Sequence, residues 1–151
     1  MSLKMNRLKV NESSETTKQL WSLANGPKSH VKEYTVCIVN GVKFHTRDLN
    51  NCHVTQNSGV CTEGDHEGEM NDFYGHVCKI CELKYVFRHK FILFQCEWCN
   101  TGTNGQRRMI RIDAQCTSID VTSRGYENDP FILPSQARQV FYLQDIKLGE
   151  P

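Results

Sequence analysis

The sequence has no excess charge of either sign and no long apolar run. Its 18 Lys and Arg side chains nearly balance 17 Asp and Glu, and the net charge of +1 excludes the uniformly basic profile of a histone-like or ribosomal protein. No stretch approaches the roughly 18 apolar residues that a membrane span needs, and the N-terminus lacks the apolar segment of a signal peptide. We therefore predict a soluble, intracellular protein with no membrane contact.

Motifs of catalysis are also missing. The chain contains no G-x-S-x-G, no phosphate-cradling glycine loop and no H-E-x-x-H, and no local signature marks a Cys–His nucleophile pair. We predict that the protein is not an enzyme and has no small-molecule substrate. Without a secretory signal, the eight cysteines are not expected to form a disulfide framework, which leaves metal ligation or burial as thiols.

The 151 residues are about the length of one domain and contain two clear local structures in the N-terminal part. Thr16 and Gln19 form a capping box, apolar residues follow at helical spacing, and Asn25-Gly26-Pro27 ends a short helix. Two β-rich runs, 34–39 and 42–46, then flank Asn40-Gly41, the strongest signal for a two-residue type I′ hairpin.

The middle of the chain carries a dense acidic segment. Residues 51–72 contain five acidic side chains and no Lys or Arg, and residues 63–72 have few apolar residues, so we interpret 63–72 as a solvated linker. The predicted division is an N-terminal tail (1–15), a helix and hairpin segment (16–62), the acidic linker (63–72), a β domain (73–146) and a C-terminal tail (147–151).

After the acidic segment the pattern is typical of β structure. Ile92, Phe94, Cys96 and Trp98 alternate with polar residues along one strand, and Val77, Lys79, Cys81 and Leu83 are expected to share one face of another. Further strands are predicted at 109–114 and 140–143. The sequence thus predicts a mainly β fold: a small rolled sheet or SH3-like barrel of five to six strands, preceded by a short N-terminal helix and a β-hairpin.

Four of the cysteines have the spacing of a zinc ribbon. Cys78-x-x-Cys81 is followed by Cys96-x-x-Cys99, and four thiolates of this kind can hold a structural zinc. However, residues i and i+3 of an extended strand point to opposite faces, and no glycine follows either pair to tighten a turn. We predict free, partly buried thiols and no cofactor; a zinc-stabilised nucleic-acid-binding domain is the alternative.

Residues 73–112 combine seven basic side chains with several aromatic ones. Cationic groups that meet phosphates, beside rings that stack on bases, are typical of a nucleic-acid surface, although the aromatic residues could equally be the core of the sheet. If this segment binds nucleic acid, the expected contacts are Lys84, Arg88, Lys90, Arg107, Arg108 and Arg111. The acidic segment before it should oppose binding, so deletion of residues 63–72 is expected to strengthen it.

Several motifs occur in an order that resembles a known family. They include Gln19–Pro27, Val39–Thr46, Phe94–Trp98 and, as the most specific block, Tyr126–Ala137 followed by Gln139–Tyr142. Together they resemble the C-terminal domain of unknown function of plant En/Spm-like (CACTA) transposon proteins, over roughly residues 16–149. The resemblance implies a transposon-derived, nuclear protein whose partner is a transposase subunit, chromatin or DNA.

The same resemblance bears on catalysis and on zinc. The family's catalytic carboxylates belong to an upstream nuclease region that nothing in this sequence matches, so we expect a stand-alone fragment or a truncated element product. In the family, the position of Cys96 is commonly Cys, whereas those of Cys78, Cys81 and Cys99 usually hold other residues. This departure argues against a zinc site shared by the family. We therefore expect a non-enzymatic interaction module.

Overall fold

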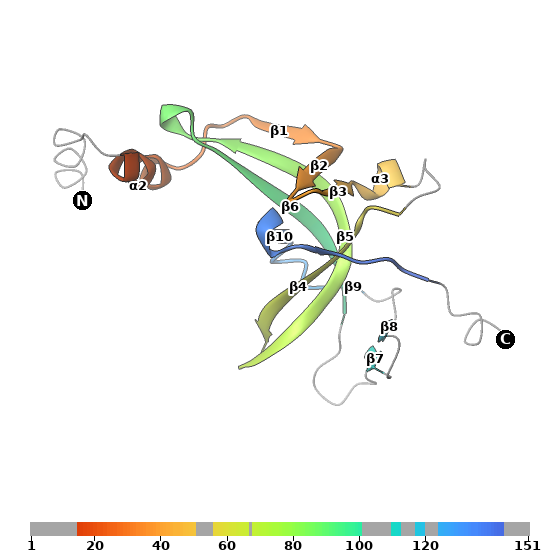
Figure 1. The fold of residues 1–151 in the computed structure, drawn as a ribbon. Helices are drawn as coiled ribbons and strands as arrows, with labels where there is room; N and C mark the ends of the chain where they lie inside the picture. The colour runs from red at the N-terminus through yellow and green to blue at the C-terminus, as the bar shows by residue number, and fades with distance from the viewer. Residues whose placement is uncertain are drawn as a thin grey trace.

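The computed structural model describes residues 15–50, 56–66, 68–100, 110–112, 117–119 and 124–143. Most of these residues lie in β-strands, preceded by one longer helix (Figure 1). The helices are α2 (Glu15–Asn25) and α3 (Arg47–Asn50), with 3-10 turns η1 (Val86–Arg88) and η2 (Pro134–Gln136). The strands are β1 (Val31–Tyr34), β2 (Val36–Val39), β3 (Val42–His45), β4 (Gly59–His66), β5 (Glu69–Lys84), β6 (Lys90–Cys99), β7 (Ile110–Ile112), β8 (Thr117–Ile119), β9 (Arg124–Gly125), β10 (Phe131–Ile132) and β11 (Arg138–Gln139). No helix of the described part is long and apolar enough to cross a membrane.

The predicted helix and hairpin of the N-terminal part are confirmed, but α2 already includes Glu15, so Thr16 lies inside its first turn and is not the N-cap. The helix ends at Asn25, and Gly26 follows in the left-handed region with φ +74°. β2 and β3 pair antiparallel around Asn40 and Gly41, whose φ angles of 49° and 79° are both positive, as a type I′ turn requires. These elements formed as predicted because their signals are local, namely a cap, a spacing and a two-residue turn.

The long strand β5 organises the main sheet. It pairs antiparallel with β6 along one edge, while the other edge pairs first with β4 and then with β1. The short strands β9 and β10 add to β6, and β11 adds to β4. The sheet is rolled but is not closed into a barrel, and the pronounced bend of β5 is visible in Figure 1.

A β-bulge at Cys78 corrects the predicted faces of β5. The register with β6 shifts between Val77 and Lys79, so Val77 and Ile80 both lie in the core although they are three residues apart. Cys81 pairs with Leu93 and thus lies on the face opposite to Ile80. The expectation that Val77 and Cys81 share a face was wrong, because the bulge at Cys78 shifts the alternation of side chains by one residue.

The core lies where the β2–β3 hairpin packs on the bent sheet. Phe44 of β3 and Phe94 of β6 are almost fully buried, with ring centroids 5.2 Å apart. The alternation predicted for β6 is confirmed, since Phe94, Cys96 and Trp98 are all buried. Burial of two Phe rings supplies several kcal/mol of hydrophobic stabilisation, at about 1.5–3 kcal/mol for each side chain.

Two further predictions are wrong. Residues 63–72 are not an irregular linker, because Glu63 pairs with Asp72 and Asp65 with Met70 in the β4–β5 hairpin. Their charged side chains lie on the exposed part of a paired ribbon, which is why the composition resembled a linker. Residues 140–143 are not a strand; the pairing with β4 lies two residues earlier, at Arg138 and Gln139. The predicted strand at 109–114 is partly confirmed by β7, and its remaining residues lie outside the described part.

Candidate functional site

Three of the six predicted nucleic-acid contacts come together at the turn between β5 and β6. Lys84 and Lys90 are paired residues at the ends of the two strands, and Arg88 lies in η1 between them. We call residues 84–91 the basic turn. Arg111 belongs to β7, which lies at the far end of the molecule from this turn in Figure 1. Arg107 and Arg108 lie outside the described residues.

The basic turn also carries exposed aromatic rings. Phe87 is 42% exposed and Phe91 is 36% exposed, and the ring of Phe91 meets Tyr85 edge to face at 5.1 Å. Phe94 and Trp98, in contrast, are core residues. The aromatic rings near the start of β6 are therefore accessible, as a nucleic-acid surface requires. Those near its end are buried and belong to the core of the sheet.

The backbone of the basic turn is strained at two neighbouring residues. Phe87 and Arg88 have φ angles of 59° and 61°, in the left-handed region that favours glycine. Each such residue costs about 1–2 kcal/mol. Strain of this kind persists only where surrounding contacts impose it, and it is concentrated at functional sites.

Helix α2 supplies these contacts. The hydroxyl of Ser22, which is fully buried, donates to the carbonyl of Val86 at 2.7 Å and lies 2.9 Å from Nδ1 of His89. His89 Nε2 lies 3.0 Å from the Glu15 carboxylate, and this hydrogen bond lowers the pKa of Glu15. A Ser–His–carboxylate order is also that of hydrolases, but here the hydroxyl is buried and already donates to a carbonyl, so the arrangement anchors the turn.

One carboxylate moderates the charge of the basic turn. Lys84 and Lys90 are directly opposite each other, and the buried Glu82 lies 4.0 Å and 3.7 Å from their amines. Its second oxygen accepts a hydrogen bond from Tyr34 at 3.1 Å. Lys32 pairs with Glu82 across β1, and Lys28 donates its backbone N–H to the carbonyl of Lys84. These two lysines were not predicted, because they lie some fifty residues away in sequence and only the pairing of β1 with β5 brings them here.

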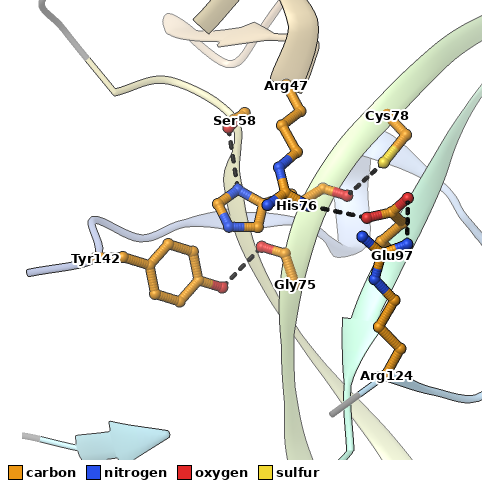
Figure 2. A network of polar contacts seen from close by, with 8 residues as sticks. All are labelled: Arg47, Ser58, Gly75, His76, Cys78, Glu97, Arg124 and Tyr142. Atoms are coloured by element: carbon orange, nitrogen blue, oxygen red, sulfur yellow. Dashed lines mark hydrogen bonds and ion pairs between the residues drawn. The ribbon is translucent and has the colours of Figure 1, made fainter. Parts of the chain in front are cut away.

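A second polar cluster lies in the middle of the sheet (Figure 2). His76 is 3.1 Å from the buried Ser58 hydroxyl and 4.7 Å, centroid to centroid, from the Tyr142 ring. Glu97 forms ion pairs with Arg47 at 2.9 Å and Arg124 at 3.2 Å. The Tyr142 hydroxyl donates to the carbonyl of Gly75 at 2.7 Å, so the cluster fixes the C-terminal segment and α3 on the sheet.

Burial shifts the pKa values of His76 and Cys78 in the directions that favour their neutral forms. Burial, and then the nearby Arg47, lower the pKa of His76, which therefore stays neutral near pH 7. Burial raises the pKa of Cys78, whose thiol donates weakly to the carbonyl of His76 at 3.6 Å. A thiol with a raised pKa is a poor nucleophile, and the Ser58 hydroxyl is fully buried.

The four cysteines of the zinc alternative lie at separate positions on the sheet. Cys78 is in the bulge, Cys96 is in the core, and Cys81 pairs with Leu93 on the opposite face. Cys99 lies three residues after Cys96 in the same strand, so their side chains point to opposite faces. Cys99 pairs with Arg124 of β9. Within the described ranges, no group of three or more His, Cys, Asp or Glu residues could hold a metal ion.

One family model matches the chain. Residues 81–150 match the family described as "Domain of unknown function (DUF4216)". The matched region begins just before the basic turn and includes β6 and the segment that contains Tyr126. Among curated proteins and among solved structures, nothing matches the chain significantly.

Proposed function

We propose that this protein is a non-enzymatic interaction module of a transposon-derived plant protein, and that the basic turn binds nucleic acid. The observation that carries the proposal is the joint presence of Lys84, Arg88 and Lys90 with the exposed rings of Phe87 and Phe91 on one strained, anchored turn. The matched family is common in plant transposase-related proteins, which supports the origin. The resemblance to En/Spm-like elements supports a nuclear location.

The chemistry of the turn favours single strands over duplexes. Ammonium and guanidinium groups recognise phosphates of either form, but a phenylalanine ring stacks at least cost on a base that is already unpaired, because insertion into a duplex must first unstack two base pairs. Binding is therefore expected to be weak, independent of sequence and sensitive to salt.

The test is a titration of fluorescently labelled single-stranded and duplex DNA, followed by fluorescence anisotropy. If four basic side chains contact phosphates, the slope of log K against log salt is about −2.8 on single strands and about −3.6 on duplex. The absence of binding at low salt to either probe would refute the proposal. A transposase subunit or another protein would then be the expected partner.

Phe87→Gly separates binding from folding. Glycine accepts the φ of 59° without strain, so the variant should unfold at the same temperature as the natural protein or above it. Loss of one stacked base should weaken single-strand binding by about 5-fold to 150-fold, from about 1–3 kcal/mol per base. The matched control is Lys43→Gln, which neutralises an exposed lysine on β3 and should leave binding unchanged. Equal affinities for the two variants would contradict the proposal.

We further propose that the protein binds no stoichiometric zinc. The separate positions of the cysteines in the sheet support this expectation. Metal analysis of protein purified without chelators should give well under one equivalent of zinc. One bound zinc per chain, together with a lower unfolding temperature in the presence of EDTA, would instead support the zinc-stabilised alternative.

A further inference from the structure

A cavity of about 300 Å³ lies far from the basic turn, where β4, β5 and β6 meet the segment 126–136. Four of its eleven lining residues are aromatic, namely Phe73, Trp98, Tyr126 and Phe131. Trp98 is 5% exposed, Phe73 and Tyr126 meet edge to face at 5.0 Å, and Phe131 is 46% exposed. The ring faces of such residues carry negative electrostatic potential, which attracts cations.

The charged residues that line the cavity are all acidic. Glu63, Asp65 and Asp129 line it, whereas none of its described lining residues is Lys, Arg or His. Arg138 is 3.8 Å from Glu63 but forms its shorter ion pair, at 2.7 Å, with Asp72. Asp129 forms no ion pair with any residue of the described part. Among the described residues, the cavity thus has three lining carboxylates and no lining cation, and Arg138 pairs with one of the three, Glu63.

Two backbone features keep the aromatic walls in place. A Cβ at Gly64 would approach the Phe73 ring to 2.9 Å, so only glycine allows the ring to lie there. Tyr126 has a φ of 56° and thus holds its ring in the cavity at the cost of a left-handed conformation. Tyr126 also begins the block of sequence that resembles the transposon family most specifically.

We propose that this cavity binds an alkylammonium group, namely the methylated end of a lysine side chain from a partner protein. Methyl groups on the ammonium spread its charge and weaken its hydration, so it loses less when it leaves water for an aromatic cavity. Nearby carboxylates add Coulomb attraction without the several oxygen ligands at close range that a metal ion needs. The site is separate from the basic turn and does not depend on nucleic-acid binding.

The experiment uses three small probes that share one backbone and one side-chain length, two of which also have the same shape at the end of the side chain. They are N-acetyl-trimethyllysine amide, N-acetyl-lysine amide and a neutral analogue in which a tert-butyl group replaces the trimethylammonium. Binding is followed by chemical-shift changes of the indole N–H of Trp98 and by tryptophan fluorescence. The trimethylated probe should bind with a Kd on the order of 1 mM. The unmethylated and neutral probes should bind at least about fivefold more weakly, which corresponds to about 1 kcal/mol of cation–π attraction.

Matched variants test whether the carboxylate of Asp129 attracts the trimethylated probe. Asp129→Asn should weaken the trimethylated probe about threefold or more, while Glu127→Gln, two residues earlier and exposed but outside the cavity, should have no effect. Gly64→Ala should abolish binding by displacing Phe73. Phe87→Gly, at the basic turn, should retain it, and this distinguishes failure of the cavity from failure of the nucleic-acid proposal.

Several results would overturn the inference. Equal binding of the neutral and trimethylated probes would identify a merely apolar cavity. N-acetyl-arginine amide serves as a fourth probe, and its tighter binding would assign the site to a guanidinium group. Equal effects of Asp129→Asn and Glu127→Gln, or no shift of Trp98 with the trimethylated probe in large excess, would also refute it.

Discussion

The two ends of β5 differ in charge and in the way that their turns are built. Strand β5 begins in the acidic β4–β5 hairpin and ends at the basic turn, about 50 Å further along the bent strand for 16 residues. In the acidic hairpin, Gly68 takes the positive φ of 86°, and its N–H donates to Asp65 at 2.9 Å. In the basic turn, Phe87 and Arg88 adopt such angles themselves. The acidic turn thus has a glycine where the backbone angle favours one, whereas the basic turn has Phe87 and Arg88 at such positions in spite of the strain.

Both ends depend on the same core, so the largest expected effect comes from its centre. Phe94→Ala should lower the free energy of unfolding by about 3–5 kcal/mol and impair both sites, because Phe94 is fully buried against Phe44. Chemical denaturation measures the effect. Phe141→Ala, at a ring that is 64% exposed, is the control and should change stability by less than about 0.5 kcal/mol.

Removal of the anchor should separate the two ends. Ser22→Ala leaves the Val86 carbonyl and His89 without the hydroxyl that contacts both, at a cost of about 1–3 kcal/mol. Amide hydrogen exchange should accelerate in the basic turn, and nucleic-acid binding should fall, while the ammonium probe still binds. Leu23→Ala, at an exposed neighbour on α2, is the control. Unchanged exchange in the turn would show that α2 does not impose the strain.

The cluster between the two ends should make stability depend on pH. The pKa of His76 is lower in the folded state than in the unfolded chain, so the unfolded chain binds more protons as the pH falls. The stabilisation is thus present above about pH 6.5, the ordinary histidine value, and is lost as the pH falls through the lower folded pKa. Denaturation curves at a series of pH values should show a drop on acidification that His76→Gln reduces. Parallel curves for the two proteins would exclude His76 as the cause.

The smallest effect concerns communication between the ends. The sequence predicts that deletion of residues 63–72 strengthens nucleic-acid binding. Because this deletion would remove paired strand residues, single substitutions are the appropriate test. Glu69→Gln should change binding by less than about 1.5-fold at physiological salt, where screening acts over about 8 Å. Glu82→Gln, between Lys84 and Lys90, should strengthen it by about twofold or more. An equal gain from both would mean that long-range charge controls binding.

The amino-acid sequence by itself determined the structures whose signals are local. Helical spacing with a glycine cap was sufficient for α2, Asn40-Gly41 for the β2–β3 turn, and strict alternation for the buried face of β6. Three of the six residues proposed from the sequence, Lys84, Arg88 and Lys90, lie together in the structure because they follow one another along one turn. In each case the residues that decide the structure lie within a few positions of one another, where backbone geometry relates pattern to shape directly.

Tertiary structure alone decided the remaining features. The bulge at Cys78 arises where β5 exchanges β4 for β1, the anchor joins Ser22 to a histidine 67 residues away, and the aromatic cavity combines four separate segments. The acidic composition of the segment 63–72 is typical of a linker, but the pairing of β4 with β5 places it in a hairpin. The periodicity of a sequence predicts which face of a strand each residue occupies. The pairing between strands instead depends on burial and hydrogen bonding over the whole chain, so it cannot be predicted from a short segment.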